Sequence, residues 1–231
     1  MTFSTLNFIY LFVGLLAGVV INTLADYLPS SSTPLSPQWR TWGWSKRKRP
    51  LLVLLSTAVL FFLLPLWLTV PVDLIFNSIY IAILILIIVT DLEHKLIYNV
   101  VTYPATVLAI IGSNFVSSDE NTWKLSIVGA IVGFVIFFVL YQLANLIYGS
   151  DRIPLGMGDV KLAMMMGAML GFHRIPFALF WGIILGGVVT ILLLFTRRVS
   201  RQSALPYGQY LALSGIWFLI WGVDYAQQYL S

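Results

Sequence analysis

The chain has 231 residues and a mean hydropathy of +0.92, and only 10% of its residues are charged. Soluble domains carry about 25% charged residues, so this composition excludes an ordinary soluble domain and predicts a membrane protein. The net charge of +4 is expected to reflect membrane topology rather than a nucleic-acid partner, and the absence of cysteine excludes disulfides and thiolate zinc sites.

Eight apolar segments predict an all-α membrane protein, a bundle of about eight transmembrane helices in a single domain covering residues 1–231. In chain order the segments are residues 5–28, 51–70, 72–90, 100–116, 123–148, 159–171, 176–196 and 209–227. Residues 29–50 form a short basic loop between the first two segments. No basic residue precedes the first segment, so we expect a retained helix rather than a cleaved signal peptide.

The basic residues are distributed unevenly around these segments. If the eight segments alternate in direction, all the lysines and arginines except Lys124 and Arg174 fall on one side of the membrane. The positive-inside rule makes that side cytoplasmic. Both termini are then expected on the outer side, the loop 29–50 in the cytoplasm, and the chain in the cell (inner) membrane, where lipids contact it.

Small residues recur at a spacing of four in several segments. Gly129 and Gly133 form one such pair, and Ala163 and Gly167 form another. This spacing places small side chains on one helix face, where it lets two helix backbones approach closely in lipid. The pattern predicts close helix packing rather than a functional site.

Two aspartates are the strongest candidates for chemistry. Asp91 ends the third apolar segment and Asp159 opens the sixth, so both are expected at a similar depth on the cytoplasmic side. If the two helices are neighbours, the carboxyl groups can share a site, where they cannot easily both ionise. One carboxylate could then take a proton from water while the other, protonated, polarises a peptide carbonyl. This arrangement predicts hydrolysis by paired aspartates.

The segment 159–171 is too short to cross a bilayer. Thirteen helical residues extend roughly 20 Å, whereas the hydrocarbon core is about 30 Å thick. Either the helix continues past Gly171, or it begins below the membrane surface with Asp159 in a water-filled pocket. In the second case, Gly156 and Gly158 would give the preceding backbone room to bend.

Other interpretations of the two aspartates stay open at this point. Asp159 could simply cap a helix, because aspartate is favoured at that position. A proton-coupled transporter or channel could use Asp91 and Asp159 as a relay, although broken helices and internal repeats typical of transporters are not evident. A non-catalytic membrane assembly factor is a third alternative.

Asp159 lies within LGMGDVKL at residues 155–162, and Asp91 opens DLEHKLIYN at residues 91–99. These two motifs resemble those of the type IV prepilin peptidase family of GxGD-type intramembrane aspartyl proteases, with Tyr98 where the family usually has proline. The similarity extends to residues 18–29 and to LPYGQYLA at residues 205–212, so it spans nearly the whole chain.

This resemblance implies eight transmembrane helices and cleavage of short basic leaders from pilin, pseudopilin or flagellin-like precursors at the cytoplasmic face. It assigns Asp91 and Asp159 as the catalytic pair and Gly156 and Gly158 to the active-site loop. Lys161 and Asn99 are auxiliary positions whose role it leaves open.

Many members of this family bind zinc through two Cys-x-x-Cys pairs in the first cytoplasmic loop and also methylate the new N-terminus. This chain has no cysteine, so we expect no zinc and no cofactor for proteolysis. The resemblance leaves open whether S-adenosylmethionine is used for methylation.

Overall fold

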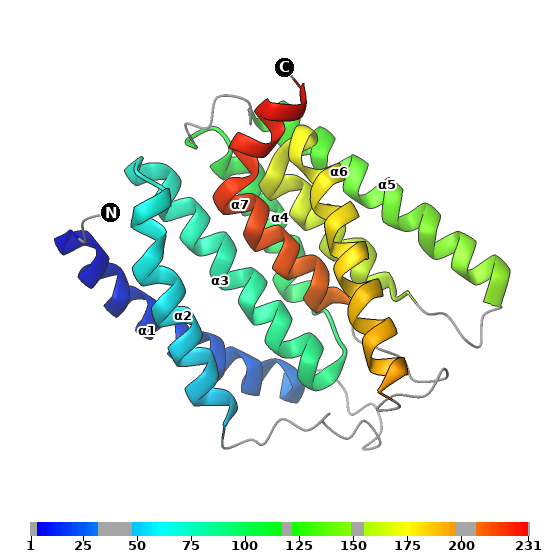
Figure 1. The fold of residues 1–231 in the computed structure, drawn as a ribbon, viewed down its shortest axis with the longest axis horizontal. Coiled ribbons are helices and arrows are strands. Elements are labelled where there is room, and N and C mark those ends of the chain that lie inside the picture. The colour runs from blue at the N-terminus through cyan, green and yellow to red at the C-terminus, as the bar shows by residue number, and fades with distance from the viewer. Residues whose placement is uncertain (1–3, 32–47, 117–121, 149–154, 197–206, 231) are drawn as a thin grey trace.

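The computed structural model describes residues 4–31, 48–116, 122–148, 155–196 and 207–230, and these residues form seven α-helices (Figure 1). The helices are α1 (Thr5–Ser31), α2 (Arg49–Trp67), α3 (Pro71–His94), α4 (Asn99–Gly112), α5 (Trp123–Tyr148), α6 (Met157–Phe195) and α7 (Gly208–Leu230). Within the described ranges, five of them, α1, α2, α3, α5 and α6, are long and apolar enough to cross a membrane. The prediction of a multi-pass, all-α membrane protein is therefore confirmed.

The predicted number of helices differs from that in the described part of the chain. The predicted segments 159–171 and 176–196 are the two arms of one bent helix, α6, which is interrupted at Gly171 by a backbone φ of 73° and ψ of 174°. Glycine adopts this conformation without the steric cost that a side chain would add. The described residues thus form seven helical elements rather than eight, because the sixth and seventh predicted segments follow each other directly across this kink.

The predicted basic loop 29–50 is only partly described. Helix α1 continues to Ser31, and α2 begins at Arg49, so both ends of the predicted loop are helical. The residues between 32 and 47, which carry most of the basic cluster, lie outside the described residues. The same is true of Arg197, Arg198 and Arg201.

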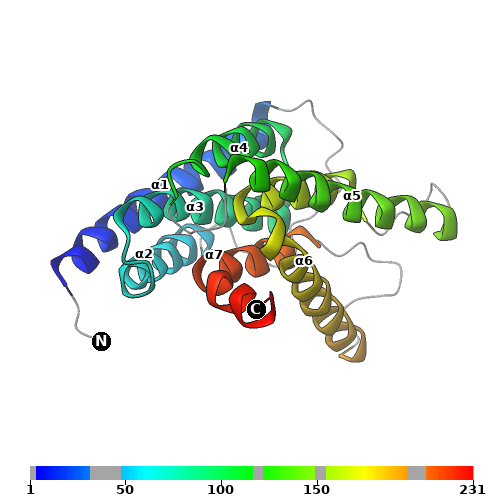
Figure 2. The same cartoon turned by 90° about the horizontal axis from the view of Figure 1, so that it is seen from above.

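Helix α3 lies at the centre of the bundle (Figures 1 and 2). In its most apolar stretch 56% of the residues are buried within the protein, compared with 22–28% in the other four candidate spans. The apolar face that lipid would cover is therefore largest on the surrounding helices, whereas α3 packs against protein on most sides. This position brings the C-terminal end of α3, with Asp91, into the interior.

Helices α5 and α6 pack against each other at the small residues whose spacing of four predicted a close approach. A Cβ atom added to Gly167 would lie 2.9 Å from the Cα atom of Ala130 and would also strike the backbone carbonyl of Gly129. Gly133 lies in the same way against the carbonyl group of Ala163. This crossing fixes the first arm of α6, and hence Asp159, against α5.

The Gly167→Ala variant is expected to lower stability. Its added methyl group would meet backbone atoms, which cannot rotate away, so the two helices must separate. Overpacking of this kind costs about 1–3 kcal/mol, which should appear as a lower thermal unfolding temperature in detergent. Gly187→Ala is the matched control, because no atom lies within 4 Å of the Cβ that it adds. An unchanged unfolding temperature for Gly167→Ala would contradict the close crossing.

Candidate functional site

Asp91 lies in the last turn of α3, where the chain stops being helical. The next residues turn sharply because Lys95 adopts a left-handed conformation with a φ of 54°, and its backbone N–H donates to the carbonyl oxygen of Asp91 at 2.9 Å. Helix α4 then begins at Asn99. Asp91 itself is only 4% exposed, so this helix end presents a carboxyl group to the interior rather than to solvent.

Asp159 is the third residue of α6 and is 7% exposed. Its Oδ2 accepts a hydrogen bond of 3.0 Å from the backbone N–H of Gly156, and its own N–H donates to the Gly156 carbonyl at 3.1 Å. The side chain thus reaches back to the residue before the helix, as the acidic residue of a capping box does. Asp159 is therefore not the N-cap, and the helix dipole at this end favours its negative charge.

The two carboxyl groups meet beside Gly208, the first residue of α7. A Cβ atom built on Gly208 would lie 3.2 Å from Oδ2 of Asp91 and 3.3 Å from Oδ1 of Asp159. Because both oxygens lie this close to one point, they are at most 6.5 Å apart, which is the sum of 3.2 Å and 3.3 Å. The next residue, Gln209, donates its backbone N–H to Oδ2 of Asp91 at 2.9 Å. Three helices, α3, α6 and α7, therefore build the site.

Ile97 closes one side of this site. It follows the turn after α3, and its Cβ lies 3.1 Å from the position that a Cβ on Gly158 would occupy. Its Cδ1 also lies 2.9 Å from the corresponding position on Gly208. Glycine at 158 therefore lets Ile97 pack closely against the start of α6, and a side chain there would require Ile97 to shift by a few tenths of an ångström. Within the described residues only Gly171 among the glycines has a positive φ, so Gly156 and Gly158 do not adopt the left-handed backbone conformation that favours glycine.

Lys161 and Asn99 form a separate contact between α6 and α4. The Lys161 ammonium donates to Oδ1 of Asn99 at 2.8 Å and lies 5.7 Å from the centre of the Tyr103 ring. This pair lies at the exposed edge of the same end of the bundle. The contact joins the start of α4 to the start of α6.

A metal centre is not evident among the described residues. No three histidine, cysteine, aspartate or glutamate side chains in those ranges are grouped closely enough to hold an ion. The chain contains no cysteine at all, so the thiolate zinc motif is absent.

Three residues of the site were not predicted from the sequence as site residues. Gly208, Gln209 and Ile97 contact the aspartates or the glycines around them. The available signal for the first two was the similarity of residues 205–212 to the entrance of the family's last helix, which does not reveal a contact with Asp91. Ile97 lies inside the motif of residues 91–99, but its apolar side chain suggested no role.

The fold and the site define a class of protein: a multi-pass membrane protein with two buried aspartates facing each other at one end of its helical bundle. Comparison with known proteins gives a more specific result. Residues 78–191, which include Asp91 and Asp159, match the type IV leader peptidase family. The chain belongs to this family.

The similar proteins found in the comparison are named prepilin leader peptidase/N-methyltransferase. The protein of Stutzerimonas stutzeri is 28% identical over 144 residues, covering 61% of this chain and 47% of the relative. The Aeromonas hydrophila protein is 29% identical over 184 residues, covering 78% and 59%. The Legionella pneumophila protein is 30% identical over 163 residues, covering 69% of this chain and 54% of the relative. The chain spans about half the length of these relatives, and no solved structure matches it.

Proposed function

We propose that the chain is an intramembrane aspartyl endopeptidase that removes the leader peptide of type IV pilin-like precursors. One observation carries the proposal: the buried carboxyl groups of Asp91 and Asp159 both lie within 3.3 Å of one point beside Gly208. Two carboxyl groups that flank one point in this way can hold one water molecule and one carbonyl group between them. Membership of the type IV leader peptidase family supports the same chemistry.

The proposed reaction needs one proton shared by the pair. The ionised carboxylate accepts a proton from water, whose oxygen attacks the carbonyl carbon of the scissile peptide bond, while the protonated carboxyl group donates to the carbonyl oxygen. When the C–N bond of the resulting diol breaks, the leaving nitrogen takes the proton that the first carboxylate received. The second carboxylate takes back a proton from a diol hydroxyl, so the products are a carboxyl group and an amine and the pair again holds one proton. The two aspartates act as a coupled unit, so neither is assigned alone as acid or base.

The surrounding residues are proposed to hold this pair in place. The N–H groups of Gln209 and Gly156 each donate to one of the carboxyl groups, which orients the aspartates without adding a charge. Gly156 and Gly158 are proposed to shape the active-site loop, Gly158 by letting Ile97 pack closely against it. Lys161 and Asn99, through their 2.8 Å contact, are proposed to fix the start of α4 relative to the start of α6.

The proposed membrane orientation places the aspartates at the cytoplasmic face of the cell membrane and both termini on the outer side. The uneven distribution of basic residues supports this orientation. In Figure 1 α1 begins and α7 ends at the end of the bundle where α3 also begins, as an even number of membrane crossings requires. The two arms of α6 count as two crossings in this proposal. The proposed substrates are pilin, pseudopilin or flagellin-like precursors with short basic leaders.

The experiment that tests this function is cleavage of a purified prepilin-type precursor by the purified protein in detergent. Mass spectrometry of the products should show a leader and a shortened pilin, with the cut before the apolar segment of the precursor. Folded protein that leaves several such precursors intact would contradict the proposal.

Chelation is expected to leave this cleavage unchanged. The proposed chemistry uses only the two carboxyl groups and water, and the chain lacks the cysteines of the zinc motif. The initial rate should therefore be equal with and without an excess of EDTA. A strong loss that added zinc reverses would show that a metal takes part.

Methylation of the new N-terminus is a separate question. The relatives carry N-methyltransferase in their names, and the same incubation with S-adenosylmethionine would show a mass increase of one methyl group if this chain has that activity.

A further inference from the structure

Arg49 is a buried cation near the site that the proposed reaction does not use. The charge pattern of the sequence placed it among the loop cations between the first two segments. It is instead only 6% exposed at the beginning of α2. A buried arginine is rarely tolerated without ionic partners, so its contacts identify what it holds.

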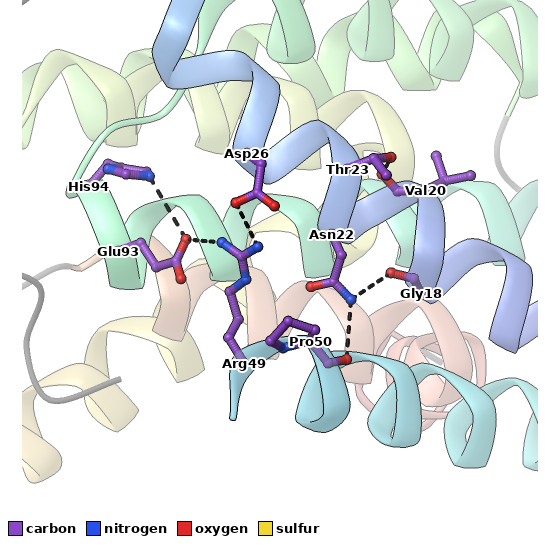
Figure 3. A network of polar contacts seen from close by, with 9 residues as sticks. All are labelled: Gly18, Val20, Asn22, Thr23, Asp26, Arg49, Pro50, Glu93 and His94. Atoms are coloured by element: carbon purple, nitrogen blue, oxygen red, sulfur yellow. Dashed lines mark hydrogen bonds and ion pairs between the residues drawn. The ribbon is translucent and has the colours of Figure 1, made fainter. Parts of the chain in front are cut away.

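Arg49 joins two carboxylates that come from two other helices (Figure 3). Its NH1 lies 2.7 Å from Oε2 of Glu93 on α3, and its NH2 lies 2.7 Å from Oδ1 of Asp26 on α1. The Glu93 side chain is 6% exposed, whereas that of Asp26 is 69% exposed. The pair with Glu93 is therefore the buried one, in which removal of one partner would leave a charge without compensation.

Glu93 belongs to the same helical turn as Asp91. Residues two apart on an α-helix point to nearly opposite sides, because each residue advances by about 100°. Asp91 accordingly faces α7, where Gln209 donates to it, while Glu93 faces Arg49. The last turn of α3 is thus held from both sides by polar contacts.

The helices that Arg49 joins to this turn form a tightly packed hairpin. On α1, a Cβ atom added to Gly14 would lie 2.7 Å from the carbonyl oxygen of Thr57 on α2. Asn22 of α1 also donates to the carbonyl oxygen of Pro50, the residue after Arg49, at 3.2 Å. The first turn of α2 is therefore fixed on α1, and Arg49 transmits this fixed position to α3.

We infer that Arg49 is a positioning residue for Asp91 that acts through Glu93. The inference rests on the proposed function for its kinetic consequences, and it names the contact that fixes where α3 ends. A buried ion pair contributes little net stability compared with well-packed neutral residues. The planar guanidinium group of Arg49, however, fixes the distance and direction between α2 and α3. Loss of the link should let the last turn of α3 move away from α6 and α7.

The central variant is the double substitution Arg49→Met with Glu93→Gln, which removes both charges and leaves neither one buried alone. We expect it to fold with nearly the wild-type unfolding temperature. The value of kcat should fall by roughly 10²-fold, the effect of displacing a catalytic group by about 1 Å, with little change in KM. Arg49→Lys keeps the positive charge but lacks the planar guanidinium group, so its kcat should lie between the values of the wild type and the double variant.

The comparison variants separate positioning from a general loss of structure. Asp26→Asn should change kcat little, because its contact is exposed. Arg174→Met removes another buried arginine, 8% exposed, which donates to the carbonyl oxygen of Leu170 at 2.8 Å, and it should lower the unfolding temperature without the selective fall in kcat. A double variant with wild-type kcat, or one altered in KM alone, would overturn the inference.

Hydrogen exchange gives a readout that does not depend on peptidase activity. In the double variant, backbone amides of residues 90–98 should exchange faster, while those of residues 160–170 keep the wild-type rate. Equal acceleration in both segments, or in neither, would overturn the inference. If the wild type cleaves no precursor, the proposed function fails, and the exchange result still decides whether Arg49 positions the end of α3.

Discussion

The Asp91→Asn and Asp159→Asn variants are each expected to lose cleavage by roughly 10⁴-fold or more while remaining folded. Asparagine keeps the shape of aspartate and still accepts the hydrogen bonds from Gln209 and Gly156, but it cannot take a proton from water or donate one as a carboxylic acid. The rate of precursor cleavage by purified protein, together with the unfolding temperature of each variant, tests this expectation.

The paired mechanism makes a further demand on these variants. Because the two carboxyl groups act as a unit, the double Asp91→Asn, Asp159→Asn variant should be no less active than either single variant. Asp73→Asn is the matched control, since Asp73 lies in the first turn at the other end of the same helix, α3. Near wild-type cleavage by either single variant would contradict the mechanism. If Asp73→Asn lost as much cleavage activity as Asp91→Asn or Asp159→Asn, the loss would reflect removal of any acidic residue rather than the catalytic pair.

Gly208→Ala is expected to be the most damaging substitution outside the aspartates. The added methyl group would lie 3.2 Å from Oδ2 of Asp91 and 3.3 Å from Oδ1 of Asp159, which is where the water and the scissile carbonyl must approach. It would also lie 2.9 Å from Cδ1 of Ile97, the far end of a flexible side chain that can turn away. The fold should therefore tolerate the change, whereas kcat should fall by roughly 10²-fold.

The matched control is Gly187→Ala, which makes the same substitution where no atom lies within 4 Å of the added Cβ. Its cleavage rate should equal that of the wild type. Measuring kcat and the unfolding temperature of both variants separates obstruction of the site from altered folding. A Gly208→Ala protein with the wild-type kcat would mean that the reacting groups do not pass beside Gly208.

The location of the two aspartates was predictable because it depends on local sequence and on topology. Asp91 precedes a turn and Asp159 follows a glycine pair, so each falls at a helix end, and the positive-inside rule places the two ends on one side. Two features of α6 depended on the three-dimensional backbone. Gly171 links the two arms of α6 through a non-helical kink, and Asp159 occupies the third helical position rather than the cap.

The contacts between distant segments were not predictable. Gly208 meets Asp91 only because α7 packs against α3, and no local pattern encodes that approach. Arg49 has the sequence surroundings of a loop cation, with basic residues before it and a proline after it. Its burial follows from the approach of Glu93, a residue 44 positions away. Charge patterns predict on which side of a membrane a residue lies, but not whether it is buried there.

The central claim is that Asp91 and Asp159 hydrolyse a peptide bond rather than relay protons across the membrane. The most direct test reconstitutes wild type and Asp159→Asn in liposomes with a prepilin-type precursor, and measures precursor cleavage and proton uptake in the same vesicles. The account predicts cleavage by the wild type, none by Asp159→Asn, and proton uptake equal to that of empty liposomes for both. An intact precursor together with proton uptake that Asp159→Asn abolishes would contradict it.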